Sequence, residues 1–79
     1  MNCQEWLELQ EQYEECFYND KEGLFLLIKK LTRAIEALKK VNKEFYGLVS
    51  AETLAEMVHK HNCAVEVYLY LQTIERINQ

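Results

Sequence analysis

The sequence predicts an all-α fold, a single helical domain over residues 1–79 built as an antiparallel three-helix bundle with coiled-coil-like packing. With 79 residues the chain is long enough for one domain. It has no proline and only two glycines, so it lacks the turn residues of a many-stranded β fold. Apolar residues recur at three- and four-residue spacing, as on the buried side of a helix. The expected helices span about residues 3–18, 21–46 and 51–77.

The first expected helix begins after Asn2, whose side chain and Glu5 fit a capping box. Met1 and Trp6 hold the positions of a hydrophobic staple around that cap. One apolar stripe follows along the helix, formed by Trp6, Leu9, Tyr13 and Phe17. We expect the helix to end near Tyr18, before the sequence Asn19-Asp20. If that pair fails to break the chain, a long helical hairpin is the alternative.

The second expected helix has near-heptad spacing, with two neighbouring rows of apolar residues. Gly47 can adopt the left-handed conformation that closes a helix, and Leu48 would then pack back on the last turn. Asn42 lies at a core heptad position and has two interpretations. It fixes the register of a coiled coil, or it lies near a helix end and bonds to solvent.

The third expected helix begins at Ser50, a good N-cap residue, and meets no proline or glycine before Gln79. One face is expected to meet the other two helices, formed by Ala64, Val67, Tyr68, Leu71 and Ile74. Residues 65–71 also alternate as a strand would, but a lone strand has no partner in a helical chain. The sequence leaves open whether residues 61–64 break this helix.

Charge is segregated along the chain. The formal net charge is −4, and the acidic residues dominate before residue 21 and after residue 48, whereas basic residues dominate between them. This order favours antiparallel neighbours, although exposed ion pairs contribute only about 0–1 kcal/mol each.

The cysteines and the N-terminal segment indicate a cytoplasmic protein. There are three cysteines, an odd number, and none forms a C-x-x-C motif, so free thiols are expected. The first 20 residues contain no lysine or arginine, unlike a signal peptide, and the longest apolar run is residues 24–28. We therefore expect no contact with a membrane.

Candidate sites for chemistry are weak. Glu56, His59 and Cys63 share one helix face, but only two of them are good zinc ligands, so we expect no metal and no cofactor. Cys63 would lie in mid-helix, where backbone N–H groups are already bonded and cannot form an oxyanion site. His61 points to the apolar stripe and is expected to be a hydrogen-bonded histidine at the core edge. The sequence therefore predicts that the protein is not an enzyme.

Residues 54–69 loosely resemble a helix-turn-helix motif. The resemblance rests on Leu54-Ala55-Glu56 and on Val65 and Leu69, and it implies a DNA-binding regulator as the alternative function. His59 stands where the motif's turn has glycine, however, and the recognition segment carries more acid than base. The lysines and arginine of the second helix are interleaved with glutamates, which is typical of a solvated face. Nucleic acid is therefore not the expected partner.

Apolar residues exceed what one small core can use, and this surplus predicts an interface. The residues expected to face a partner lie off the main stripes: Val65, Leu69, Tyr70 and Ile77 on the third helix, and Phe25 and Leu26 on the second. The predicted function is a non-enzymatic protein–protein interaction module, a small acidic helical adaptor, chaperone or inhibitor. We expect it to act as a homodimer or in a heterocomplex.

Overall fold

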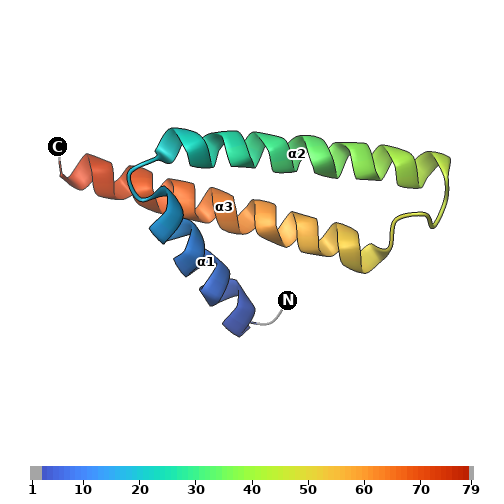
Figure 1. Cartoon of the computed structure of the whole chain (residues 1–79), viewed down its shortest axis with the longest axis horizontal. Helices are drawn as coiled ribbons and strands as arrows, with labels where there is room; N and C mark the ends of the chain where they lie inside the picture. The colour runs from blue at the N-terminus through green and yellow to red at the C-terminus, as the bar shows by residue number, and fades with distance from the viewer. Residues whose placement is uncertain (1–2, 79) are drawn as a thin grey trace.

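A computed structural model describes residues 3–78, which form three α-helices (Figure 1). Helix α1 spans Cys3–Phe17, α2 spans Lys21–Glu44 and α3 spans Ala51–Ile77. Helices α2 and α3 run antiparallel as a long hairpin, and α1 crosses the hairpin obliquely from its open end (Figure 1). The predicted all-α three-helix bundle is confirmed.

The break between α1 and α2 is set by Asp20. Its carboxylate accepts a hydrogen bond from the backbone N–H of Gly23 at 3.0 Å and so caps α2. Because this cap begins a new helix, the alternative of an unbroken helical hairpin is wrong. The first helix ends at Phe17, one residue earlier than predicted. The predicted cap at Asn2 and staple from Met1 lie outside the described residues.

The end of α2 differs from the prediction. The helix ends at Glu44 rather than at residue 46, and Phe45 is its C-cap. Gly47 has a φ of +82°, as its left-handed role requires, but Leu48 is 68% exposed and does not pack on the last turn.

The physical reason lies in Asn42, whose side chain organises the loop. Its Oδ1 accepts hydrogen bonds from the backbone N–H groups of Gly47 at 3.2 Å and Val49 at 3.4 Å. A side chain that bonds the following backbone draws the chain out of the helix. Asn42 therefore lies near a helix end, as one of the two interpretations has it, but its side chain bonds to the backbone of the following loop rather than to solvent.

Helix α3 is continuous over 27 residues, so residues 61–64 do not break it. The predicted cap is confirmed, since Ser50 Oγ accepts a hydrogen bond from the N–H of Thr53 at 3.1 Å. The strand-like alternation of residues 65–71 is overridden by helix packing.

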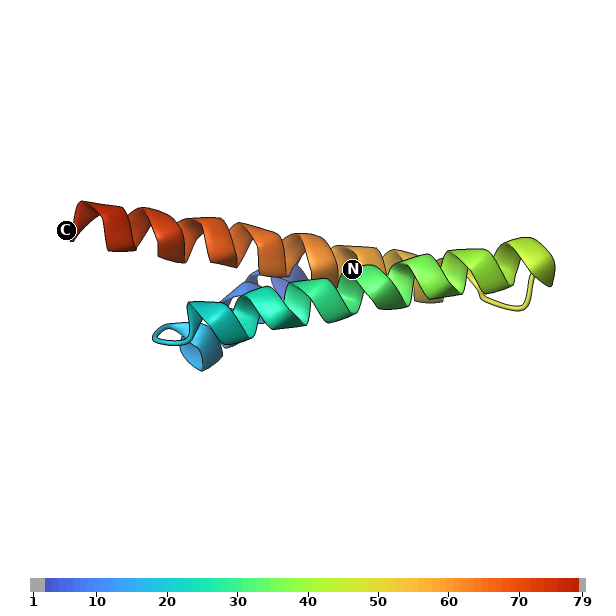
Figure 2. The same cartoon turned by 90° about the horizontal axis from the view of Figure 1, so that it is seen from above.

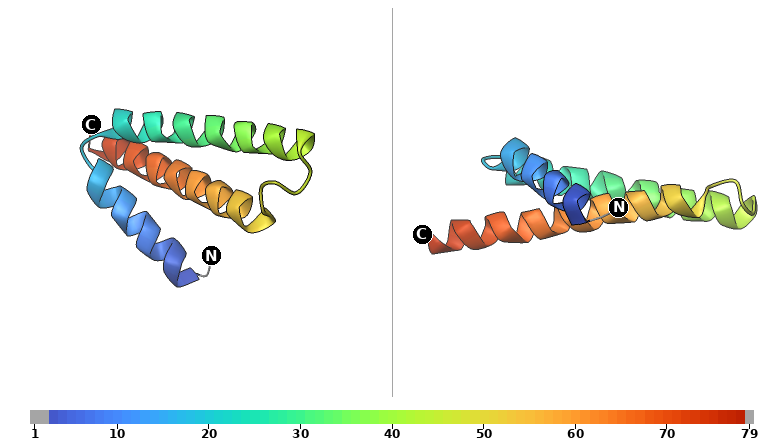
Figure 3. Two further views of the ribbon diagram at one scale, coloured as in Figure 1. Left: turned by 45° about the vertical axis from the view of Figure 1, so that its right-hand side comes forward. Right: turned by 90° about the horizontal axis from the view of Figure 1, so that it is seen from below.

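The core lies where the three helices converge, at the end of the hairpin away from its loop (Figure 3). Leu24, Ala64, Val67 and Leu71 form its buried cluster, and Tyr13 and Phe17 pack against it from α1. The face predicted for α3 is the one that packs there: Ala64, Val67 and Leu71 are buried, and Tyr68 and Ile74 are half-buried. From this end α1 diverges from the hairpin (Figure 3).

The molecule is extended for its mass. Its Cα atoms span 49 × 25 × 16 Å with a radius of gyration of 14.5 Å, whereas a typical domain of this length has about 12 Å. The thin profile of the hairpin is seen from above in Figure 2. The shape leaves much of each helix in contact with solvent.

Candidate protein-interaction surface

Large hydrophobic side chains are exposed in greater number than they are buried. Among the described residues only six hydrophobic residues are buried, whereas ten large ones are exposed. The exposed set comprises Leu7, Tyr18, Phe25, Leu26, Phe45, Tyr46, Leu48, Leu69, Tyr70 and Ile77. Scattered apolar side chains are normal on any protein surface, so what matters is whether they cluster.

One cluster lies on the surface where the start of α2 meets the C-terminal half of α3. We call this surface the hairpin face. It consists of Phe25, Leu26 and Tyr68, which line one groove, and we include Val65 and Leu69 as its edge on α3. The rings of Phe25 and Tyr68 have centroids 5.8 Å apart, which joins the two helices. A shallow groove of about 290 Å³ runs beside them, lined by Lys21, Glu22, Phe25, Leu26 and Tyr68. On α3, Val65 lies one turn before both Tyr68 and Leu69, so it connects Leu69 to the groove-lining Tyr68 at the edge of this face.

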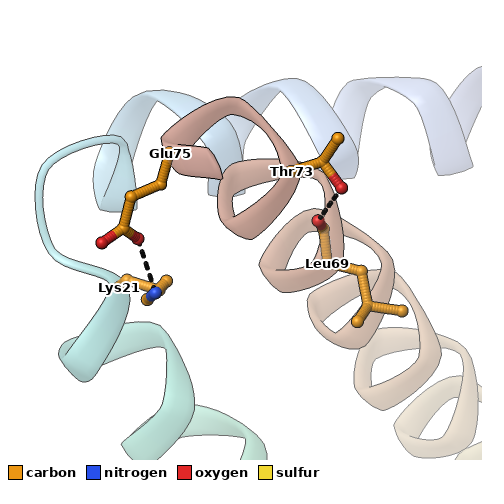
Figure 4. Close-up of polar contacts among 4 residues, drawn as sticks. All are labelled: Lys21, Leu69, Thr73 and Glu75. Carbon is orange, nitrogen blue, oxygen red and sulfur yellow. Dashed lines mark hydrogen bonds and ion pairs between the residues drawn. The ribbon is translucent and has the colours of Figure 1, made fainter. Parts of the chain in front are cut away.

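Cationic side chains lie over the two rings of the hairpin face. Lys21 Nζ lies 5.8 Å from the centroid of the Tyr68 ring, and Lys29 Nζ lies 4.8 Å from that of Phe25. Lys21 also forms a salt bridge of 2.6 Å with Glu75 on α3 (Figure 4). This hydrogen bond to Glu75 is the main cause that raises the pKa of Lys21. The start of α2 is thereby linked to the last turns of α3 by a partly exposed ion pair.

The backbone beneath Leu69 is satisfied within its own helix. Thr73 Oγ1 donates a hydrogen bond to the carbonyl oxygen of Leu69 at 2.9 Å (Figure 4). The Leu69 side chain itself is 54% exposed. The position therefore offers an exposed apolar side chain on a continuous helix.

The six residues predicted to face a partner form two surfaces rather than one. Phe25, Leu26 and Leu69 are exposed on the hairpin face, and Val65 is half-buried there. Tyr70 and Ile77 are exposed as well, but they lie on the side of α3 that faces α1.

Contacts between α1 and α3 define that second side. The rings of Trp6 and His59 meet edge to face with centroids 6.3 Å apart, and Gln10 Nε2 donates to Glu66 Oε2 at 3.2 Å. Tyr70 and Ile77 follow Glu66 by four and eleven residues, which keeps them on the same side of the helix.

The tip of the hairpin is an exposed apolar segment that the sequence reasoning missed. Phe45 is 63% exposed and Tyr46 is 99% exposed, and they precede the exposed Leu48. The prediction of a longer α2 hid these residues, because it placed Phe45 and Tyr46 in a helix and Leu48 against it. The signal that could have found them is Asn42, a residue that often bonds to loop backbone.

Side chains capable of chemistry are not assembled for it. Burial, followed by the nearby Glu66 and Glu14, raises the pKa of the Cys63 thiol to about 11, so the thiol stays protonated at neutral pH. The His59 ring packs against Trp6. No group of three potential metal ligands occurs among the residues that the structure describes.

His61 lies at the edge of the core, as predicted. It is half-buried, and its Nδ1 lies 3.3 Å from Oδ1 of the neighbouring Asn62. The two histidines of the chain are therefore placed by packing and local bonding.

The segment that resembles a helix-turn-helix motif has no turn. Residues 54–69 all lie within α3, which runs without interruption from Ala51 to Ile77. In residues 3–78, none of the helices combines the length and the apolar character needed to span a membrane.

Comparisons with protein-family models, with curated proteins and with solved structures give no match.

Proposed function

We propose that this protein is a non-enzymatic protein–protein interaction module, a small acidic helical adaptor, chaperone or inhibitor that acts by binding another protein. The observation that carries the proposal is the excess of exposed surface. The accessible surface is 6094 Å², whereas a compact monomer of this mass exposes roughly 5,000 Å². Among the described residues, ten large hydrophobic side chains are exposed, and water solvates apolar surface poorly.

The hairpin face is the surface that we assign to partner binding. Aromatic residues are enriched in interfaces because a ring buries a large area at a small cost in side-chain entropy. Phe25 and Tyr68 are already oriented by each other and by Lys21 and Lys29. Less conformational entropy is then lost when a partner binds.

The absence of catalysis and the location in the cytoplasm are parts of the same proposal. The protonated, buried Cys63 supports the first, because a nucleophilic thiol must ionise and reach a substrate. Three free cysteines support the second, because free thiols are typical of a reducing compartment. The partner in that compartment is a different protein, a second copy of the chain, or both.

The test is photocrosslinking from single positions in the full chain, in cells of the source organism. A photoreactive amino acid replaces Leu69 on the hairpin face or, as a matched control, Leu7 on α1, which is 57% exposed. We expect a crosslinked product of defined mass from position 69 that position 7 does not give.

The identified partner is then purified and its affinity measured. We expect Leu69→Asp to weaken binding by about tenfold or more, as for an interface hot spot, and Leu7→Asp to leave it unchanged. Equal crosslinking from positions 7 and 69, or equal loss of affinity, would contradict the proposal.

A further inference from the structure

Helix α1 differs from α2 and α3 in that none of its residues is buried. It contacts the core cluster through Tyr13 and Phe17, and both of these rings are only half-buried. Its axis diverges from the hairpin (Figure 3). Segments with few buried apolar contacts open at a lower free energy than the rest of a protein. Helix α1 is therefore the first element expected to separate from the fold.

The charges of α1 do not favour its contact with α3. The helix carries five glutamates and no lysine or arginine. Glu14 of α1 and Glu66 of α3 both lie near the Cys63 thiol, so two charges of the same sign meet across this contact and repel each other. The hydrogen bond from Gln10 to Glu66 opposes the repulsion, but it is exposed and water competes for both groups.

The hairpin of α2 and α3 has contacts of its own that do not involve α1. All four residues of the buried cluster belong to these two helices. Asp20 caps α2 locally, and the pair of Lys21 with Glu75 and the rings of Phe25 and Tyr68 join α2 to α3. These contacts remain when α1 leaves, so separation of α1 does not require the hairpin to unfold.

We propose that α1 is a lid that opens as one unit while the hairpin of α2 and α3 stays folded. The connection at residues 18–20 is the hinge, since α1 ends at Phe17 and the Asp20 cap begins α2 independently. Opening uncovers the fully buried Cys63, which lies beside Tyr13 and Glu14 of α1. The inference goes beyond the proposed function and does not depend on it, because the hairpin face contains no residue of α1.

Probes for the two ends of α1 test the inference in the full-length chain. Trp6 is the only tryptophan and packs edge to face on His59, so its fluorescence reports on the N-terminal half of α1. Cys63 reports on the C-terminal half through pulse labelling with a thiol reagent, once Cys3→Ser and Cys16→Ser have removed the exposed thiols. Both signals are followed along a urea titration, together with far-UV circular dichroism, to which α2 and α3 contribute most of the helicity.

We expect the Trp6 and Cys63 signals to change together, at a urea concentration lower by about 0.5 M or more than the midpoint of the main loss of helicity. Transitions that do not coincide show that unfolding passes through a populated intermediate. Here that intermediate is the hairpin with α1 released.

A pair of tyrosine variants in the same background links the early transition to the docking of α1. Tyr13→Ala removes a ring that contacts the core cluster only while α1 is closed. It should move the Trp6 and Cys63 transitions to lower urea and leave the later loss of helicity unchanged. Tyr18→Ala is the matched control, because Tyr18 is 59% exposed and lies beyond the end of α1, and it should move them less. If Tyr13→Ala releases α1 without urea, the later loss of helicity alone should remain.

Three results would overturn the inference. The first is a single transition shared by all three signals in the wild type. The second is an early change of Trp6 without labelling of Cys63, which would mean that only the first turns of α1 fray. The third is an equal shift of the early transition by Tyr13→Ala and Tyr18→Ala. None of these results bears on the proposed function, which the crosslink from Leu69 on the hairpin face tests separately.

Discussion

At the scale of single residues, short side chains that bond to nearby backbone decide where the helices begin and end. Asp20 begins α2 by accepting the N–H of Gly23, and Asn42 ends it early by accepting the N–H groups of Gly47 and Val49. Each side chain satisfies backbone donors that would otherwise lack partners at a helix terminus or in a loop. The connections of this bundle are therefore specified locally, with little help from the core.

Because Asp20 caps α2 through the N–H of Gly23, the effect of a substitution at residue 23 depends on the side chain at residue 20. Alanine in a helix interior is normally more stable than glycine by about 0.5–1 kcal/mol, but a Cβ at Gly23 would collide with the Asp20 carboxylate. We therefore expect Gly23→Ala to give no gain in the wild type and to stabilise an Asp20→Ala background, in which the obstacle is gone. Asp20→Ala alone should cost about 1 kcal/mol.

Urea unfolding of the two single variants and the double variant measures this coupling. The interaction free energy from the double-mutant cycle should be at least about 0.5 kcal/mol. Additive effects would show that the cap does not depend on the absence of a side chain at residue 23.

Because Cys63 is buried, the free energy of unfolding depends on pH in the alkaline range. Its pKa is raised from the ordinary 9.0 to about 11, chiefly by burial and then by Glu66 and Glu14. Between these values the thiol ionises in the unfolded chain but not in the folded one, so the unfolded state binds fewer protons. The stabilising contribution is present in full below pH 9.0 and is lost as pH rises toward about 11.

Two measurements check this prediction. The free energy of unfolding in urea should fall from pH 9 to pH 11, and more steeply than in Cys63→Ala, which removes the thiol but keeps the other titrating groups. With a thiol reagent at neutral pH, the exposed Cys3 and Cys16 should react first and Cys63 only when α1 opens or the chain unfolds. Parallel pH profiles of the wild type and Cys63→Ala would contradict the assignment.

At the scale of elements, α3 has sides with different roles. Ala64, Val67 and Leu71 face the core, whereas Leu69 and Tyr70 are about half exposed on two other sides. Removing a buried leucine side chain leaves a cavity and costs about 2–5 kcal/mol, whereas exposed positions change stability little.

We therefore expect Leu71→Ala to lower the free energy of unfolding by about 2–5 kcal/mol. The half-buried Leu31 packs against the same cluster, and Leu31→Ala should act in the same direction. The double change Leu69→Ala with Tyr70→Ala should keep far-UV helicity and weaken assembly. If the double change instead removes helicity while assembly of the folded fraction is unchanged, Leu69 and Tyr70 belong to the fold rather than to an interface.

The same element shows how far sequence reasoning reached and where it stopped. Periodicity located the three helices and the core-facing side of α3, because that information is local to each helix. It could not assign Tyr70 to the side that faces α1, because the oblique course of α1 depends on contacts such as Gln10 with Glu66. It also missed Phe45 and Tyr46 at the hairpin tip, since the bonds of Asn42 to Gly47 and Val49 form only in the folded loop.

At the scale of the whole molecule, a net charge of −4 is spread over an elongated shape, and the basic residues are concentrated on α2. An ion pair joins α2 and α3, formed by Lys21 and Glu75 at 2.6 Å. Both partners are partly exposed, so this pair orients the helices more than it stabilises them. The field of the molecule is thus negative overall, with one basic helix.

This charge distribution predicts weak binding to duplex DNA. Affinity for DNA comes largely from lysines and arginines that neutralise phosphates, and a recognition helix must enter the major groove. The segment expected to provide such a helix is the middle of the uninterrupted α3, and α1 lies beside it, as the hydrogen bond between Gln10 and Glu66 shows. We expect only salt-sensitive binding without sequence preference, with a dissociation constant of about 10⁻⁵ M or weaker at physiological salt.

Fluorescence anisotropy with a randomised pool of duplexes, repeated at two salt concentrations, measures this dissociation constant. Enrichment of one sequence bound at about 10⁻⁸ M would be the affinity of a specific DNA-binding protein and would replace the protein-interaction proposal with the regulator alternative.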